Sequence, residues 1–217
     1  MTERLQRTAG AGEASRRRFL AGAAGVLLGG LAGVRAAEAL AHIGKVERSV
    51  GRCEARRATG RRALFVGAPL YQDERVRTGA RSLLVMRLGR ETTIRLGPSA
   101  ELLLDRHLVE AGGELVLQSG PIFFSRPADA PATDTRIRSP FGLVSVRGTR
   151  FFAGPSNGVF GVFVAEGRVA VAGGGKTVIV TRGEGTDVAR PGAQPTDPAR
   201  WGRARIDAAL RSVGFTV

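Results

Sequence analysis

Three residues of this 217-residue chain, His42, His107 and Cys53, belong to the types that most often bind transition metals through nitrogen or sulfur. Zinc and copper sites need several such ligands close together, and these three are widely spaced along the sequence. A single cysteine also excludes an internal disulfide. Cys53 is therefore predicted to be a small, half-buried strand residue, and the chain is predicted to hold no metal or other cofactor.

A copper site is the one alternative that these residues leave open. If a signal peptide were removed after Ala41, His42 would become the first residue of the exported chain. Its amine and imidazole could then chelate copper together with His107, as in copper enzymes that act on polysaccharides. Ligand geometry decides such a site, and the sequence does not supply it.

Other catalytic constellations are missing from the pattern. The acidic residues are scattered at expected turns, so no pair is predicted to converge as in glycosidases. Gly173-Gly174-Gly175 lies between two expected strands and does not open a helix, which argues against a phosphate-binding loop. We therefore expect a protein that is not an enzyme.

The N-terminus has the pattern of a twin-arginine signal peptide. A weakly apolar stretch, residues 21–34, follows a basic motif and is too short for a membrane helix of roughly 20 residues. The motif consists of Ser15, Arg16, Arg17, Phe19 and Leu20. Cleavage is expected after Ala39 or Ala41, so residues 1–41 are predicted to be removed and the remainder to be periplasmic.

The chain is strongly basic, with a formal net charge of +14. Of its 33 basic residues only Lys45 and Lys176 are lysines, an arginine bias that indicates the codon composition of a genome more than nucleic-acid binding. No nucleic-acid partner is expected. A basic exported surface instead favours an unknown periplasmic protein or an anionic envelope component.

Residues 42–190 alternate between apolar and polar side chains, with a glycine-centred turn about every 8–12 residues. This rhythm predicts a single all-β domain of successive hairpins that forms a roll, a sandwich or a solenoid-like stack. In detail, Val46 and Val50 are expected on one face of a first strand. Asp73 and Glu74 are expected to be exposed, and Val76 to point inward.

Residues 191–217 have a different pattern and are predicted to form a tail with a short amphipathic helix. Asp197 is expected to cap its N-terminus and Pro198 to occupy its first position. Ile206, Leu210 and Val213 would then share one apolar face.

The second half of the expected domain carries motifs that resemble the FecR family of bacterial periplasmic domains. Earlier strands also match in order, so that the resemblance covers roughly residues 44–190. The motif residues are Ser139, Pro140, Gly142, Arg147, Gly148 and Thr149, followed by Glu166 and Gly167. Glycine inside a strand pattern marks a bend or a close backbone approach, so we predict a structural role for this motif.

The resemblance implies an all-β domain in the periplasm. Full-length regulators of this family also have a cytoplasmic segment that controls a sigma factor and a membrane helix, and this chain resembles the periplasmic part alone. We therefore expect a non-enzymatic binding or interaction module of the cell envelope. The alternative is a sensor or regulator in iron-type cell-surface signalling, which would act through a separately encoded membrane protein.

Overall fold

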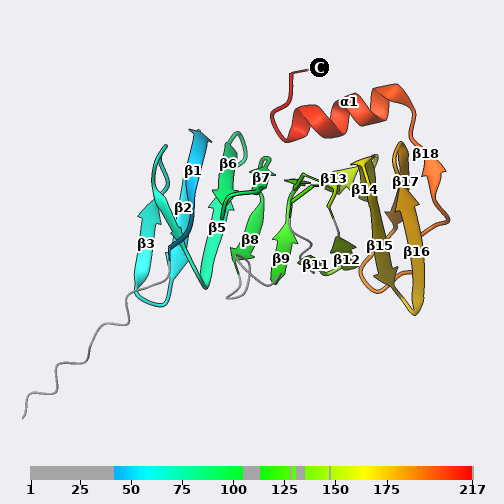
Figure 1. Ribbon diagram of the computed structural model, residues 1–217, viewed down its shortest axis with the longest axis horizontal. Coiled ribbons are helices and arrows are strands. Elements are labelled where there is room, and N and C mark those ends of the chain that lie inside the picture. The colour runs from blue at the N-terminus through cyan, green and yellow to red at the C-terminus, as the bar shows by residue number, and fades with distance from the viewer. Residues whose placement is uncertain (1–41, 105–112, 128, 131–134, 147, 217) are drawn as a thin grey trace, which may run out of the picture. The chain divides into compact units, whose positions relative to one another are not determined.

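The computed structural model describes residues 42–104, 113–127, 129–130, 135–146 and 148–216. The chain divides into two compact units, Met1–Glu38 and Ala39–Val217, and all of the described residues belong to the second. They form 18 strands and one helix, as shown in Figure 1. The expected class, an all-β domain with a short C-terminal helix, is confirmed.

The strands form two nine-stranded sheets that face each other as a sandwich. Sheet A has the order β18 (Ala199–Arg200), β17 (Glu184–Val188), β14 (Val159–Glu166), β13 (Arg150–Ser156), β10 (Ile122–Ser125), β7 (Thr92–Leu96), β6 (Leu83–Leu88), β1 (His42–Val50), β4 (Pro69–Tyr71). Sheet B has the order β16 (Lys176–Thr181), β15 (Arg168–Gly173), β12 (Gly142–Val146), β11 (Thr135–Ser139), β9 (Glu114–Ser119), β8 (Glu101–Leu104), β5 (Glu74–Thr78), β2 (Cys53–Arg57), β3 (Gly60–Ala63).

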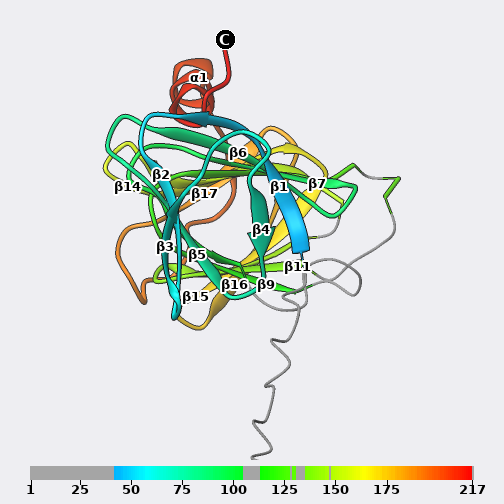
Figure 2. The same ribbon diagram turned by 90° about the vertical axis from the view of Figure 1, so that its left-hand side faces the viewer.

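The chain crosses between the sheets repeatedly as it advances from the β3 end to the β16 end (Figures 1 and 2). Hairpins such as β6–β7 and β13–β14 stay within one sheet, whereas other short turns carry the chain to the opposite sheet. The pair β9–β11 is parallel, and the other described pairs are antiparallel. The predicted stack of hairpins is therefore a two-sheet sandwich.

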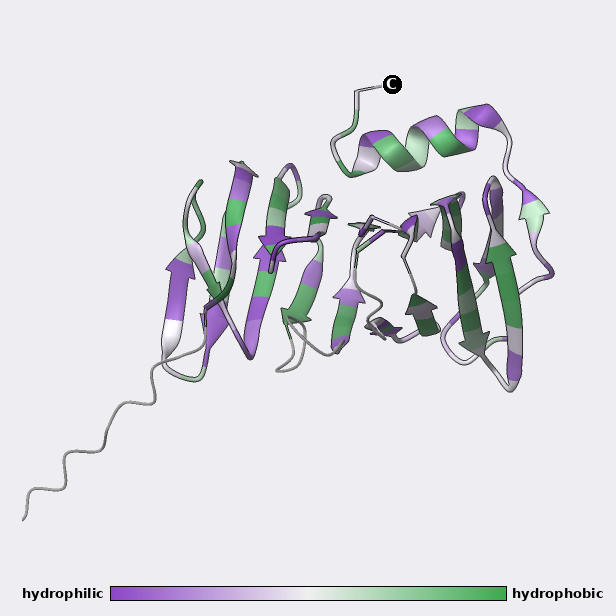
Figure 3. Ribbon diagram, viewed as in Figure 1, coloured by the Kyte–Doolittle hydropathy of each residue, from purple (hydrophilic) through white to green (hydrophobic). Residues whose placement is uncertain are grey.

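The main core lies between the sheets and contains alternate residues from both. Its largest fully buried members include Phe124, Phe151, Met86, Leu102 and Leu117. Figure 3 shows the resulting alternation of apolar and polar colour along the strands. Burial of one face of each strand is the main stabilising contribution expected for a sandwich.

Helix α1 (Arg203–Ser212) lies on the outer face of sheet A, where a second apolar cluster forms (Figures 1 and 2). This cluster joins Phe123, Phe152 and Phe163 of the sheet to Trp201, Ala209 and Val213. Ile206 and Leu210 pack against the same cluster, so the predicted apolar face of the helix is confirmed.

The predicted start of that helix is wrong. Gly202 is the N-cap, and Pro198 precedes the short strand β18. Residues 195–200 are held along β17 instead: Thr196 accepts a hydrogen bond from the Asp187 amide through Oγ1 and donates its own amide to the Asp187 carbonyl. Strand pairing therefore competes with helix formation at this point.

Two further expectations are corrected. Val46 is buried while Val50 is 40% exposed, because a bulge between Val46 and Arg48 shifts the register of β1 against β6 and changes the face of the residues that follow. Glu74 is only 1% exposed, since it shares the inward face of β5 with Val76. A third correction concerns Cys53, which was predicted to be half-buried and is only 4% exposed, because its side chain on β2 belongs to the main core.

Candidate functional site

The first part of the motif, residues 139–142, forms the turn between β11 and β12. Ser139 Oγ accepts a hydrogen bond from the Phe141 amide at 3.2 Å and donates one to the Gly142 carbonyl at 3.2 Å. A Cβ atom at Gly142 would lie 2.2 Å from the Ala172 carbonyl oxygen. Only glycine fits there, so the turn packs tightly against β15 and fixes the position of Phe141.

Phe141 forms one wall of an apolar pocket at the ends of the strands. Its ring stacks on that of Phe160 with a centroid distance of 4.5 Å and an interplanar angle of 6°. The pocket has a volume of about 360 Å³ and is built from four segments that connect or end strands, residues 117–120, 140–141, 155–160 and 189–191. Proline, phenylalanine, leucine and valine side chains provide most of its wall.

The polar groups of this pocket lie at its rim. Gln118 and Ser119 are exposed on one side, and Arg190 is the only charged residue of the lining. A pocket of this size and composition can accept one or two apolar or aromatic groups, with the guanidinium available to a carboxylate. Its residues do not include a nucleophile with an adjacent base.

The second part of the motif, residues 148–149 and 166–167, lies at the ends of β12 and β14 that are away from the pocket. Its residues pack tightly against each other. Gly148 has a φ of +54° and Gly167 a φ of +82°. A Cβ atom at Gly167 would lie 2.6 Å from Thr149 Cγ2 and 2.7 Å from the Gly148 carbonyl oxygen. The two glycine turns therefore touch each other through Thr149, which is 1% exposed.

Neighbouring groups complete this contact. Glu166 pairs with Arg150 at 3.5 Å, with both side chains about half exposed. Thr149 Oγ1 is buried and has no hydrogen-bond partner among the described residues, while the Thr149 carbonyl accepts the amide of Arg126. Such a contact leaves no open space for a ligand.

Several residues singled out in the sequence lie outside the described part of the chain. These are Arg147, His107, the targeting residues Ser15, Arg16, Arg17, Phe19 and Leu20, and the expected cleavage positions Ala39 and Ala41. His42 is described: it is exposed at the start of β1, with its ring edge-on to Tyr71 at 6.2 Å. Across the described ranges, no group of three or more histidine, cysteine or acidic side chains could hold a metal ion.

A buried ion pair near the β3 end of the sandwich was not predicted from the sequence. Glu74 accepts a two-pronged contact from Arg62, with Nη2–Oε2 at 2.8 Å and Nε–Oε1 at 3.2 Å, and also the Tyr71 amide at 3.2 Å. The alternation that placed Val76 inside applies equally to Glu74. Arg62 shields this carboxylate and binds the Pro69 carbonyl, which marks the pair as a structural feature of this end.

Two carboxylates have pKa values that the structure lowers. A hydrogen bond from Arg138, and secondarily its charge, lowers the pKa of Glu114 despite partial desolvation. The hydroxyl and the amide of Thr181 lower the pKa of Glu184. Glu114 links β9 to β11 within sheet B, whereas Glu184 lies on β17 of sheet A and is bound to Thr181 of β16 in sheet B; neither lies in the pocket.

Part of the chain is similar to a known protein family, and its fold is similar to that of known crystal structures. Residues 74–170 match the model of a family described as FecR protein. Two crystal structures of a protein from Parabacteroides distasonis ATCC 8503, described as a putative anti-sigma factor, share the fold with TM-scores of 0.52 and 0.50. Their sequence identities are 14% and 15%.

These similarities are partial in extent. Each alignment covers 63% of this chain, and 63% or 64% of the other chain. No helix of the described residues has the length and apolar character needed to cross a membrane. No curated protein sequence matches the chain.

The FecR match spans β5 to β15 and contains the whole predicted motif, including the Phe141 turn. Residues 74–170 are therefore similar to the FecR family, which confirms the resemblance that the motifs of this chain predicted.

Proposed function

We propose that this protein is an exported, non-enzymatic interaction module that binds a protein partner in signalling at the bacterial cell envelope. The observation that carries the proposal is the FecR match, whose motif turn forms a wall of the apolar pocket. The fold shared with proteins described as putative anti-sigma factors supports a regulatory role over a catalytic one. Fold alone is a weak guide to function, so the proposal depends on the pocket as well.

The pocket is suited to anchoring a partner. Interfaces concentrate binding energy in a few apolar or aromatic side chains that enter preformed, water-excluding cavities. The stacked pair Phe141–Phe160 and the neighbouring prolines provide such a cavity without any rearrangement. Arg190 at the rim would favour a partner segment that carries a carboxylate beside its apolar anchor.

The periplasm is the proposed place of action, reached through the twin-arginine signal peptide at residues 1–41. The proposed domain occupies residues 42–190, and residues 191–217 add the helix that covers sheet A. The copper alternative gains no support from the described residues, because no group of three or more histidine, cysteine or acidic side chains is found among them, and His107 lies outside them.

Transcription in the native bacterium tests the signalling role. Val159 lines the pocket and is half-buried, so Val159→Lys should place a flexible cation in the cavity with little strain. If the protein regulates a sigma factor or an equivalent system, this variant should change the transcript levels of the same gene set as a deletion of the gene. The matched control is Val50→Lys, at a residue that is 40% exposed on β1 and outside the pocket.

Both variants must first show wild-type midpoints in urea. A deletion strain with unchanged transcripts would reject the signalling role. A deletion phenotype that Val159→Lys does not reproduce would reject the pocket as the binding site.

A further inference from the structure

The four edges of the two sheets differ in how well they are protected. The edge strand β4 has three residues and begins with Pro69, and the edge strand β18 has two residues. The edge strand β3 has four residues, including Arg61 and Arg62. Short strands, proline and charge are the usual devices that prevent an edge from pairing with another chain.

The fourth edge, β16, is longer than the others and has no proline, and its one charged residue, Lys176, lies at its first position. It is a six-residue strand, Lys176–Thr181, whose central sequence Thr-Val-Ile-Val-Thr contains only β-branched residues. It pairs with β15 in continuous register without a bulge, and β15 is the only strand among the described residues that pairs with it. A regular, β-branched, unpaired edge is either an aggregation risk or a binding surface.

Alternation shows which backbone groups of β16 are available. The Thr181 amide donates to Glu184 Oε2 at 3.0 Å, so it points away from β15. Since backbone direction repeats every second residue, the amides and carbonyls of Thr177 and Ile179 also point toward the open edge. Both side chains are exposed on the outer face of sheet B, and Ile179 is 53% exposed.

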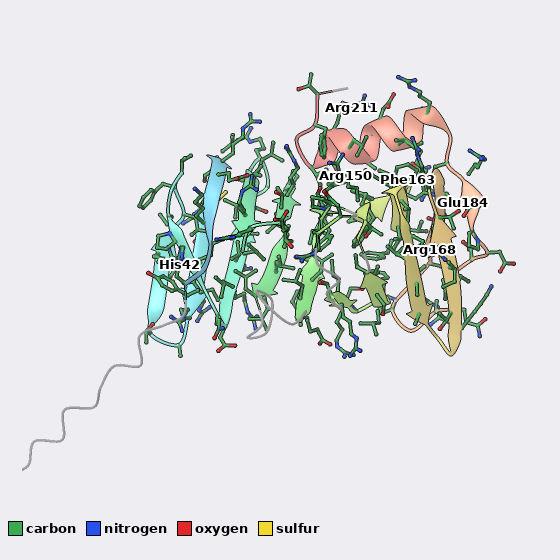
Figure 4. All side chains as sticks on the ribbon, viewed as in Figure 1. His42, Arg150, Phe163, Arg168, Glu184 and Arg211 are labelled. Carbon is green, nitrogen blue, oxygen red and sulfur yellow. The ribbon has the colours of Figure 1, made fainter. Side chains whose placement is uncertain are left out.

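Charge around this edge is uneven. Arg168 lies opposite Thr181 on β15, and Arg182 follows the strand; both are exposed and neither has an acidic partner among the described residues. Figure 4 shows Arg168 and Glu184 in this part of the molecule. At the other end of the strand, Lys176 is already bound to Asp197 at 2.6 Å. The end of β16 near Thr181 therefore has two arginines without an acidic partner among the described residues and one carboxylate, that of Glu184, which the Thr181 amide and hydroxyl already hold.

This charge argues against a second copy as the occupant. A symmetric antiparallel pair centred on Ile179 would place Lys176 of one copy, with its partner Asp197, opposite Arg182 of the other, so that Arg168 and Arg182 would gain no unpaired acidic residue. Like charges in facing positions destabilise a strand pair. An acidic segment of a different protein would instead meet Arg168 and Arg182 favourably.

We infer that β16 binds an extended segment of a partner protein as an additional antiparallel strand. The segment carries an apolar residue opposite Ile179 and an acidic residue before it, near Arg168 and Arg182, because the place beside Thr181 itself is taken by the Glu184 carboxylate. The inference rests on the proposed function only in that the chain binds a protein partner, because the edge and the pocket are built from different residues. Main-chain hydrogen bonds to Thr177 and Ile179 would supply affinity, and Ile179 with the two arginines would supply specificity.

A designed peptide tests the inference without knowledge of the natural partner. The probe is acetyl-Asp-Glu-Thr-Ile-Thr-Thr-Ser-amide, added to the ¹⁵N-labelled full-length protein. At saturating peptide, hydrogen exchange of the Thr177 and Ile179 amides should slow at least about ten-fold, since both become hydrogen-bonded donors. The Val178 and Val180 amides, which face β15, should change little.

Two matched probes separate strand addition from other contacts. Methylation of the peptide nitrogens at isoleucine and at the last threonine should abolish the protection, because these two groups donate to β16. Replacement of the peptide's Asp and Glu by lysine should weaken binding, and the double variant Arg168→Glu, Arg182→Glu should reverse this preference.

Three outcomes would overturn the inference. These are unchanged exchange at Thr177 and Ile179, equal binding of the methylated peptide, and a concentration-dependent dimer that protects the same amides without peptide. Val159→Lys should bind the peptide like the wild type. Failure at the edge with an intact pocket phenotype therefore leaves the proposed function standing, and the converse result leaves the edge standing.

Discussion

At the residue scale, two glycines allow the turns of the motif to pack closely against each other. Gly148 adopts a left-handed backbone conformation, and Gly167 approaches Thr149 too closely for any side chain. Both positions are occupied by glycine for steric reasons that do not involve a ligand. The other turn of the motif places Phe141 in the lining of the apolar pocket.

Gly148→Val should therefore destabilise the protein by about 1–3 kcal/mol, because a β-branched residue is strained at a φ of +54°. A urea melt followed by fluorescence measures the change. Gly202→Ala is the control, since Gly202 has a φ of −68° and no atom within 4 Å of an added Cβ; because Gly202 is the N-cap of α1, where alanine is disfavoured, it should cost at most about 1 kcal/mol. A wild-type midpoint for Gly148→Val, together with loss of a partner, would show that this turn is a binding site.

Glu114 should make part of the stability depend on pH. Its pKa is lowered in the folded state, mainly by the hydrogen bond from Arg138, which joins β9 to β11. A lowered folded-state pKa stabilises the protein above the unfolded-state pKa of about 4.3, and this contribution is lost as the pH falls through the folded-state value. The effect is expected to be small because the pair is partly exposed.

Urea melts between pH 7 and pH 3 measure this dependence. Glu114→Gln should be less stable than the wild type at pH 7, and the difference should shrink on acidification. Arg138→Gln should show the same trend, and the double variant should add little to either change. A pH-independent difference would mean that the pair acts through packing alone.

At the scale of elements, Trp201 and Arg205 attach the C-terminal helix to sheet A. The ring of Trp201 occupies space left by two glycines of sheet A: a Cβ atom at Gly161 would lie 2.8 Å from the ring, and one at Gly185 would lie 2.2 Å from Nε1. Phe163 stacks on the indole at 5.3 Å, and Arg205 covers its other side at 3.6 Å. Arg205 also binds Asp187 through two hydrogen bonds of 2.6 and 3.0 Å. Helix α1 is thereby attached to sheet A by the Trp201 ring and by the partly buried ion pair between Arg205 and Asp187.

Gly185→Ala should displace this anchor without removing any helix residue. Overpacking of this kind typically costs about 1–3 kcal/mol. Trp201 is the only tryptophan, so its fluorescence reports directly on docking. We expect a red-shifted emission maximum in the variant and none in Gly202→Ala. An unshifted spectrum would indicate that the sheet yields and the helix stays attached.

Deletion of residues 191–217 should leave a folded sandwich. The main core lies between the sheets, whereas the helix packs on a separate cluster on the outer face of sheet A. The truncated protein should lose its helical circular dichroism and still unfold cooperatively, with a lower midpoint because Phe123, Phe152 and Phe163 become exposed. Loss of cooperative melting would show that the helix completes the fold.

At the scale of the molecule, the possible binding features are unevenly distributed. The apolar pocket and the β16 edge belong to the half of the sandwich built from β9 to β17. His42 lies at the other end of the sandwich (Figure 4), near which the exposed Phe65 and Val66 precede β4. A partner that uses both the pocket and the edge would contact one half of the domain.

Export should require the twin arginines. The double variant Arg16→Lys, Arg17→Lys should remain cytoplasmic and unprocessed, because this route recognises the arginine pair. Arg18→Lys, which leaves the pair intact, should be exported normally. Fractionation with immunoblotting measures both, and N-terminal sequencing of the exported form distinguishes cleavage after Ala39 from cleavage after Ala41. Wild-type periplasmic levels of the double variant would show that another route is used.

The sequence by itself determined the local structure of this protein. Alternation of side chains identified the strands, glycines located the turns, and the spacing of Ile206, Leu210 and Val213 identified the apolar face of the helix. The FecR resemblance was also evident from short motifs in a fixed order. These features depend on neighbours along the chain, which the sequence displays directly.

Only the tertiary structure decided which strands share a sheet. Ser119-Gly120 separates two alternating segments like any hairpin turn, yet β9 and β10 lie in different sheets. The bulge after Val46 turned Val50 outward, and pairing along β17 delayed the helix to Arg203. The pocket combines four segments between residues 117 and 191, and the open edge at β16 exists because no later strand covers it. Contacts between distant segments settle each of these features, and no local pattern records such contacts.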